Sequence, residues 1–138
     1  MKELVLLVED DPDDLELTLA AFDHEGFLPE IQVARDGEEA LARLRGPERA
    51  PALVLLDLNI PKISGLEVLS RLREDRALAG TNVVVLSSSD DAREKRAAAE
   101  LGALAFLRKP FGLAEFAGIV RELNSILSRL RKMRNDPR

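Results

Sequence analysis

The stretch LVLLVEDDPDD, Leu4–Asp14, passes directly from an apolar run into a run of acids. A short apolar run rich in leucine and valine is typical of a strand buried on both faces of a parallel sheet. Five carboxylates follow it, at Glu9, Asp10, Asp11, Asp13 and Asp14. Like charges about 4 Å apart repel by roughly 1 to 4 kcal/mol per pair in surroundings between bulk water and a protein surface. Either water solvates all five, or some of them face a cation.

Four more short apolar runs alternate with five segments of helical spacing. With the first run, 4–8, the predicted strands are 31–34, 53–56, 83–86 and 104–107. This alternation predicts an α/β fold, in which a parallel sheet is covered by helices on both faces. A length of 138 residues suits one domain, so we expect a single domain over 1–138 with a last helix at about 113–133.

The composition excludes several classes of protein. Hydrophobic residues make up 46% of the chain, yet no apolar run approaches the roughly 18 residues that a membrane span needs. We expect no secretion signal, and the absence of cysteine agrees with a reducing compartment. A net charge of −5 gives no reason to expect nucleic-acid binding, because phosphate backbones attract basic surfaces. We therefore expect a cytoplasmic protein with neither a membrane nor a nucleic-acid partner.

The candidate site lies where the predicted strands end, because ligands of open parallel sheets bind outside the carboxyl ends of the strands. Glu9 and Asp10 follow the first strand, Asp57 the third, Ser87 the fourth and Lys109 the fifth. Alone, Asp57 is equally well explained as the cap of a turn. If the first and third strands are neighbours, however, three carboxylates meet and raise one another's pKa unless a divalent cation holds them ionised. All-oxygen ligation of this kind suits Mg²⁺.

A carboxylate at a strand tip beside Mg²⁺ suggests a nucleophile for phosphoryl transfer. Such chemistry needs positioning and charge neutralisation, for which Lys109 is the candidate cation and Ser87 the candidate hydroxyl donor. Pro110 would hold the turn after Lys109, with a cis bond as one form. Taken singly, Lys109 is better explained as a solvated surface lysine than as a functional residue.

Four motifs in this order resemble the signature of receiver domains of two-component response regulators. They are VEDD at 8–11, LLDLNIP at 55–61, LSSS at 86–89 and RKPF at 108–111. The resemblance implies a flavodoxin-like (CheY-like) fold with strand order 2-1-3-4-5, acting as a stand-alone phosphoacceptor that catalyses only its own phosphorylation and dephosphorylation. The stretches DPDDLELTLAAF and VARDGEEAL are most similar to regulators paired with bacterial phytochrome histidine kinases, which implies such a kinase as partner.

The resemblance also implies a role for each motif residue. Asp57 would accept the phosphoryl group, and Glu9, Asp10, Asp57 and the Asn59 carbonyl would hold Mg²⁺. Ser87 and Lys109 would bind phosphoryl oxygens, and Phe106 would occupy the position of an aromatic switch. Because Phe106 has no hydroxyl, packing would be the only term that drives such a switch.

The last helix carries an apolar arc of about 160°, wider than the roughly 100° that docking on a sheet requires. The arc comprises Leu113, Phe116, Ile119, Val120, Leu123, Ile126, Leu127 and Leu130. We expect a two-fold homodimer through this face. In the alternative interpretation, the wider arc covers the edge of the sheet.

Two other functions share part of this pattern. A Mg²⁺-dependent phosphohydrolase with an aspartyl-phosphate intermediate would need a second acid two residues after Asp57, where Asn59 stands. A receiver-like module that binds partners without phosphorylation would not need the complete site.

In the acidic run itself, we expect Asp11 to cap the first helix, and Asp13 and Asp14 to lie in its first turn and serve stability alone.

Overall fold

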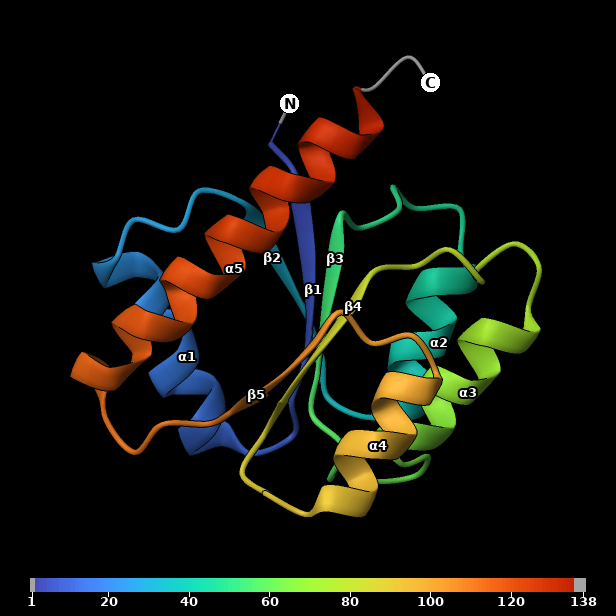
Figure 1. Ribbon diagram of the computed structural model, residues 1–138, viewed down its shortest axis with the longest axis horizontal. Helices are drawn as coiled ribbons and strands as arrows, with labels where there is room; N and C mark the ends of the chain where they lie inside the picture. Colours follow the sequence, from blue (N-terminus) through green and yellow to red (C-terminus); the bar gives the residue numbers. More distant parts are fainter. Residues whose placement is uncertain (1, 136–138) are drawn as a thin grey trace.

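The structure is a sheet of five parallel strands in the order β2-β1-β3-β4-β5, with helices on both faces (Figure 1). The computed structural model describes residues 2–135. The strands are β1 (Leu4–Val8), β2 (Glu30–Ala34), β3 (Leu53–Leu56), β4 (Val83–Ser87) and β5 (Ala105–Arg108). The helices are α1 (Pro12–His24), α2 (Gly37–Arg45), α3 (Gly65–Glu74), α4 (Ala92–Glu100) and α5 (Leu113–Arg134). The predicted fold class and strand order are confirmed.

The last strand lies one residue later than its apolar run indicated. The backbone N–H of Leu104 donates to Val83 (2.8 Å), but its side chain is 47% exposed and the ladder begins with Ala105. β4 likewise continues one residue further, to Ser87, which pairs with Arg108. As a consequence, Ser87 is held within the sheet, and Lys109 follows β5 directly.

The side chains of β1 alternate between two hydrophobic layers. Val5 and Leu7 pack with the apolar side chains of α1 and α5, while Leu6 and Val8 pack with those of α2 and α3. Figure 1 shows the same division, with α1 and α5 on one face of the sheet and α2, α3 and α4 on the other. Each fully buried valine or leucine contributes roughly 1.5–3 kcal/mol, so the two layers fix the sheet that carries the strand ends.

At the start of α1, Asp11 from the acidic run caps the helix, as the sequence predicts. The Asp11 side chain accepts hydrogen bonds from the backbone N–H groups of Asp13 (2.9 Å) and Asp14 (3.3 Å). Pro12 occupies the first turn, where its missing N–H costs nothing. The N-cap therefore fixes where α1 begins relative to Glu9 and Asp10.

The structure corrects the predicted dimer face on α5. Five of its eight residues lie in the core of the single chain, each at most 3% exposed: Phe116, Val120, Leu123, Ile126 and Leu127. Ile119 and Leu130 pack partly against the same core, and Leu113 is 40% exposed. The wide arc is needed because α5 packs against both α1 and the apolar side chains of the sheet. At 22 residues α5 is long, yet no helix in residues 2–135 is long and apolar enough to cross a membrane.

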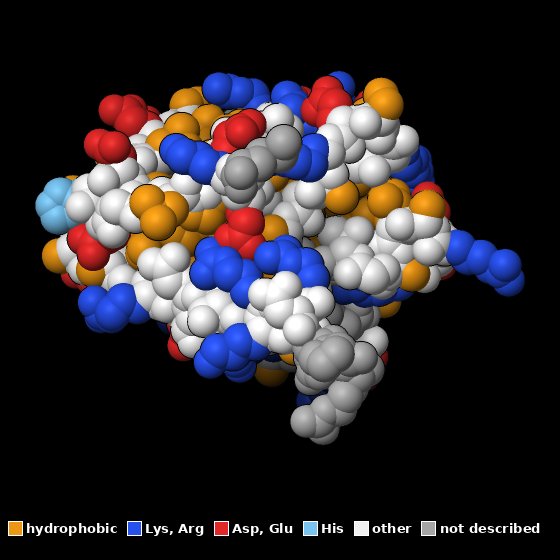
Figure 2. Space-filling model, turned by 90° about the horizontal axis from the view of Figure 1, so that it is seen from above, with side chains coloured by type: hydrophobic (Ala, Val, Ile, Leu, Met, Phe, Trp, Pro, Cys, Tyr) orange, Lys and Arg blue, Asp and Glu red, His pale blue; other side chains and the backbone are white. Residues whose placement is uncertain are grey.

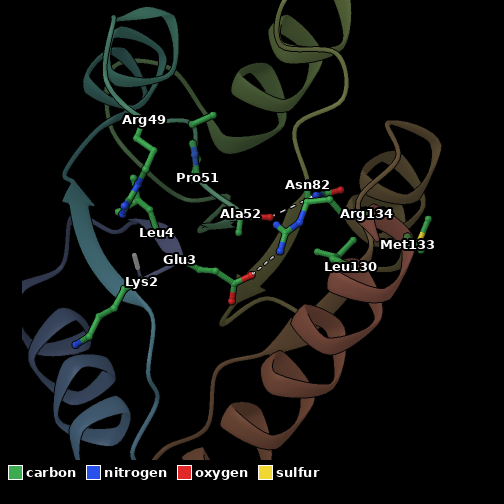
Figure 3. Close-up of a pocket in the computed structure, with 11 residues that line it drawn as sticks. Lys2, Glu3, Leu4, Arg49, Pro51, Ala52, Asn82, Leu130, Met133 and Arg134 are labelled. Atoms are coloured by element: carbon green, nitrogen blue, oxygen red, sulfur yellow. Dashed lines mark hydrogen bonds and ion pairs between the residues drawn. The ribbon is translucent and has the colours of Figure 1, made fainter. Parts of the chain in front are cut away.

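The far end of α5 is tied to the start of β1 by two arginines. Arg131 Nε donates to Glu3 Oε1 (2.9 Å), and Arg134 lies 3.6 Å from Glu3 Oε2. Figure 3 shows Glu3 pointing toward Arg134 across a cavity of about 670 Å³, which Leu4, Leu130 and Met133 also line. Lysine and arginine side chains gather on this end of the molecule (Figure 2). The cavity lies at the amino ends of the strands, away from the residues that end them.

Replacing Glu3 with Gln should lower the free energy of unfolding at pH 7 by about 0.5–1 kcal/mol, as for other partly exposed ion pairs. The hydrogen bond from Arg131 lowers the pKa of Glu3 below its ordinary value of 4.5. The stabilisation is therefore fully present above pH 4.5 and disappears as the pH falls through the lowered pKa. Urea unfolding at pH 7 and pH 3 measures the difference. Glu122→Gln, on the exposed side of α5, is the control. Equal effects of the two changes at pH 7 would contradict a stabilising ion pair between Glu3 and Arg131.

Candidate functional site

The candidate site is built from residues that follow β1, β3 and β5 at one edge of the sheet. β1 and β3 are neighbours, with Val8 opposite Leu56 in the register. The next residues, Glu9 and Asp57, are therefore brought side by side at the carboxyl edge. Both are buried, at 2% and 6% exposed. Two buried carboxylates in one crevice require positive charge nearby, because an unpaired buried charge is strongly unfavourable.

Lys109 supplies part of that charge. Its ammonium nitrogen lies 2.5 Å from Glu9 Oε1, 2.7 Å from Asp57 Oδ2 and 3.0 Å from Asp14 Oδ2. The Lys109 side chain is only 10% exposed. An ammonium has three protons to donate, so these three carboxylates satisfy it completely. The structure thus brings together Lys109, Asp57 and Glu9, as the sequence predicts, and adds Asp14.

The acids of the site are arranged suitably for a divalent cation. One oxygen from each of Glu9, Asp10 and Asp57 lies within 4.8 Å of the others, and Asp10 is the most accessible of the three. Carboxylate oxygens are the ligands that Mg²⁺ prefers in proteins. The backbone N–H of Asn59 donates to Asp57 Oδ1 (3.0 Å). Three carboxylates within reach of one ion fit the predicted metal site, and this bond orients the Asp57 carboxylate within it.

Ser87 borders the site from β4. It is 1% exposed, and its hydroxyl accepts a hydrogen bond from the Ser89 N–H (3.1 Å). Together with Asn59 and Glu94 it lines a cavity of about 320 Å³. Glu94 belongs to α4 and accepts a hydrogen bond from the Ser89 hydroxyl (2.6 Å). The cavity therefore places a hydroxyl and polar groups beside the end of β3, which Asp57 follows.

Phe106 lies in β5, half-buried against the core that α3 and α4 cover. The Lys95 ammonium sits 5.8 Å from the centre of its ring and also forms an ion pair with Asp90 (2.5 Å). A cation over an aromatic face contributes about 0.5–1 kcal/mol at an exposed site. Packing is therefore not the only term that acts on this ring, contrary to the prediction from the missing hydroxyl.

The backbone around the site is closely constrained. A Cβ on Gly65 would approach the Asp57 carbonyl oxygen to 2.5 Å, so only glycine allows α3 to begin against the end of β3. The Lys109 N–H donates to the Ser87 carbonyl (2.8 Å), which joins the ends of β4 and β5. All peptide bonds in the described part of the chain are trans, so the suggested cis form before Pro110 is wrong.

The charges of the site are unequal, because three carboxylates contact one ammonium and a fourth, that of Asp10, lies beside Glu9 and Asp57. Burial raises the pKa of Glu9 to about 7, Lys109 acts in the opposite direction, and the Asp57 charge adds to the rise. Burial disfavours the charged form of Lys109, but hydrogen bonds to Asp57 and Glu9 outweigh it, and the pKa of Lys109 is raised. The crevice therefore has too much negative charge for Lys109 alone to neutralise.

Asp14 is the site residue that the sequence analysis missed, since we assigned it to the stability of α1. The sequence does contain a signal for this position, which is how close Asp14 stands to Asp11, the N-cap of α1. Asp11 caps α1, so Asp14 lies in the first turn of a helix that begins directly after β1. A first-turn residue of such a helix stays close to the end of the strand, and here its side chain reaches Lys109.

The fold and the site together define a flavodoxin-like α/β protein with an acidic, lysine-containing pocket at the carboxyl edge of its sheet. Residues 5–121 match the response regulator receiver domain family, and the chain belongs to that family. It is therefore a receiver domain of the kind used in two-component signalling, as its motifs predict.

The chain is similar to several characterised regulators. It is 36% identical over 124 residues to the probable methanogenesis regulatory protein FilR2 of Methanothrix harundinacea (strain 6Ac), covering 87% of this chain and 80% of FilR2. Among curated transcriptional relatives, it spans about half of the DNA-binding response regulator MtrA of Mycobacterium tuberculosis (strain CDC 1551 / Oshkosh), at 34% identity over 137 residues, 99% of this chain and 54% of MtrA.

Solved structures of phytochrome response regulators are similar in both sequence and fold. The bacteriophytochrome response regulator AtBRR is 40% identical with a TM-score of 0.74, covering 90% of this chain and 94% of that one. The phosphorylated cyanobacterial phytochrome response regulator RcpA is 32% identical with a TM-score of 0.81, covering 92% and 94%. The predicted resemblance to this group is confirmed.

Proposed function

We propose that the protein accepts a phosphoryl group on Asp57 from a sensor histidine kinase in a Mg²⁺-dependent reaction. One observation carries the proposal: the buried Asp57 carboxylate lies 2.7 Å from the Lys109 ammonium, inside a cluster of acids that fits a divalent cation. Asn59, two residues later, is not an acid, which disfavours a phosphohydrolase.

In the proposed transfer, an Asp57 oxygen attacks the phosphorus atom, and the bond from phosphorus to the donor histidine nitrogen breaks with its electron pair left on that nitrogen. Bound Mg²⁺, held by Glu9, Asp10, Asp57 and the Asn59 carbonyl, would neutralise charge on the phosphoryl oxygens. Lys109 turns one N–H from Asp57 to a phosphoryl oxygen, and the Asn59 N–H continues to orient the carboxylate. The Asn59 N–H is already in place, so this donor needs no reorganisation during the transfer.

The same site would signal through Ser87 and Phe106. The Ser87 hydroxyl would turn from the Ser89 N–H toward a phosphoryl oxygen and draw the β4–α4 connection inward. The Phe106 ring would then change its position, and the cation–π contact with the Lys95 ammonium would oppose this movement. The resemblance to receiver domains implies this response for both residues, and the Lys95 contact gives the resting ring a defined place.

We propose a bacterial phytochrome histidine kinase as the partner, which would make the transfer light-dependent. The support is the similarity to AtBRR, which is named as a bacteriophytochrome response regulator, across 90% of this chain. We propose that the chain works in the cytoplasm, through protein contacts and without binding nucleic acid.

Incubation with Mg²⁺ and a small phosphodonor should add the mass of one phosphoryl group to the wild-type protein and none to Asp57→Asn. The Asn side chain lacks the negatively charged, nucleophilic oxygen of Asp but fits the same buried position. Intact-mass spectrometry measures the gain, with Asp23→Asn on the exposed side of α1 as the control. Equal gains in wild type and Asp57→Asn would show that Asp57 is not the acceptor.

The homodimer stays a prediction for the part of α5 that the core leaves accessible. Leu113 and Met133 are 40% and 71% exposed, and Ile119 and Leu130 are partly so. The double change Leu113→Glu with Met133→Glu should shift the mass from light scattering from dimer to monomer across a concentration series. Leu104→Glu, an exposed leucine before β5, is the control. A wild-type mass of one chain at all concentrations would refute the dimer.

A further inference from the structure

Asp14 contacts the ammonium that the proposed reaction depends on. Its Oδ2 lies 3.0 Å from Lys109 Nζ, and it completes the set of three acceptors whose other members are Glu9 and Asp57. Asp14 comes from a different element, the first turn of α1, whereas Glu9 and Asp57 follow strands. Its side chain is 43% exposed, so it reaches Lys109 from the rim of the crevice.

Asp14 differs from the other two acceptors in what it is free to do. Glu9 and Asp57 belong to the cluster whose oxygens lie within 4.8 Å of one another, and Asp14 does not. A cation or a phosphoryl group in the crevice would change the charges that Glu9 and Asp57 present to Lys109. Asp14 would keep its contact, because the Asp11 cap and the start of α1 fix its backbone.

We propose that Asp14 is a positioning residue that holds the Lys109 ammonium at the phosphoryl site while Asp57 is loaded. The inference rests on the proposed phosphoacceptor function. Lysine is a compact charge on a flexible four-carbon stem, so a lysine with only the reacting carboxylate and one metal ligand as partners is free to swing outward. With Asp14, one N–H can turn from Asp57 to the phosphoryl oxygen while another remains bound to α1.

Stability of α1 does not explain this contact. Asp13 and Asp14 both lie in the first turn of α1, where negative charge is favourable. Of these two residues, only Asp14 pairs with Lys109 among the ion pairs of residues 2–135. The chain therefore contains its own matched pair: the same residue type, in the same helical turn, with and without the Lys109 contact.

The test compares Asp14→Ala, Asp14→Asn and Asp13→Ala with wild type in Mg²⁺ and phosphoramidate, a small phosphodonor. Asp14→Ala should lower the rate constant of phosphorylation at saturating donor by about tenfold, because a misplaced catalytic group costs that much or more. The donor concentration for half-maximal rate should stay within about twofold, as expected for an effect on positioning rather than binding. Asp14→Asn keeps an acceptor oxygen and should recover most of the rate.

A second readout needs neither Mg²⁺ nor phosphorylation. The ¹⁵N signal of the Lys109 ammonium should be protected from proton exchange in wild type and in Asp13→Ala, and should lose that protection in Asp14→Ala. Thermal unfolding of all variants confirms that the fold is intact, and Asp14→Ser, whose side chain is too short to reach Lys109, serves if the alanine variant does not fold.

Several outcomes would overturn the inference. An Asp14→Ala rate equal to that of Asp13→Ala would assign Asp14 to helix stability alone. A faster rate in Asp14→Ala would make Asp14 a competitor for Lys109 rather than a support. Absence of phosphorylation in the wild type would overturn the proposed function itself, whereas a wild-type rate that Asp14→Ala matches overturns only the role of Asp14.

Discussion

Four carboxylates and one ammonium share the crevice at the carboxyl edge of the sheet, and this imbalance governs the rest of the site. Glu9, Asp57 and Asp14 surround Lys109 at 2.5, 2.7 and 3.0 Å, and Asp10 stands beside them. Buried like charges are costly unless they are paired. The crevice therefore favours any ligand that brings more positive charge, which is what a divalent cation does, and it holds Lys109 ready for an anion bound to that cation.

Such a site is stable only because packing and hydrogen bonds elsewhere in the fold hold its backbone in place. Two hydrophobic layers fix β1 beside β3, so the backbone cannot move to separate Glu9 from Asp57. Gly65 lets α3 begin against the Asp57 carbonyl, and the Lys109 N–H bond to Ser87 joins β4 to β5. At the other end of the molecule, Glu3 ties β1 to Arg131 on α5. The reactive end and the anchored end thus lie at opposite edges of one rigid sheet.

The resemblance to receiver domains implied the strand order, and with that order Glu9, Asp57 and Lys109 were expected to meet, because residues that end neighbouring parallel strands must share an edge. It did not predict Asp14, because helical phase decides whether a first-turn acid faces solvent or the strand end, and charge alone does not show phase. The arc on α5 was taken for a surface, since periodicity measures how wide an apolar face is but not what covers it. Phe106 was similarly judged without Lys95, a contact between side chains eleven residues apart on different elements.

The most direct test of the charge imbalance is a titration of the protein with Mg²⁺, followed through its amide NMR signals. Signals of Glu9, Asp10, Asp57, Asn59 and Lys109 should shift together with one affinity, and Asp10→Asn should weaken that affinity while Asp13→Asn leaves it unchanged. Because Asp10 is the most accessible acid of the cluster, its replacement disturbs the packing least. Shifts confined to other surfaces, or an Asp10→Asn affinity equal to that of wild type, would contradict a cation site at the carboxyl edge.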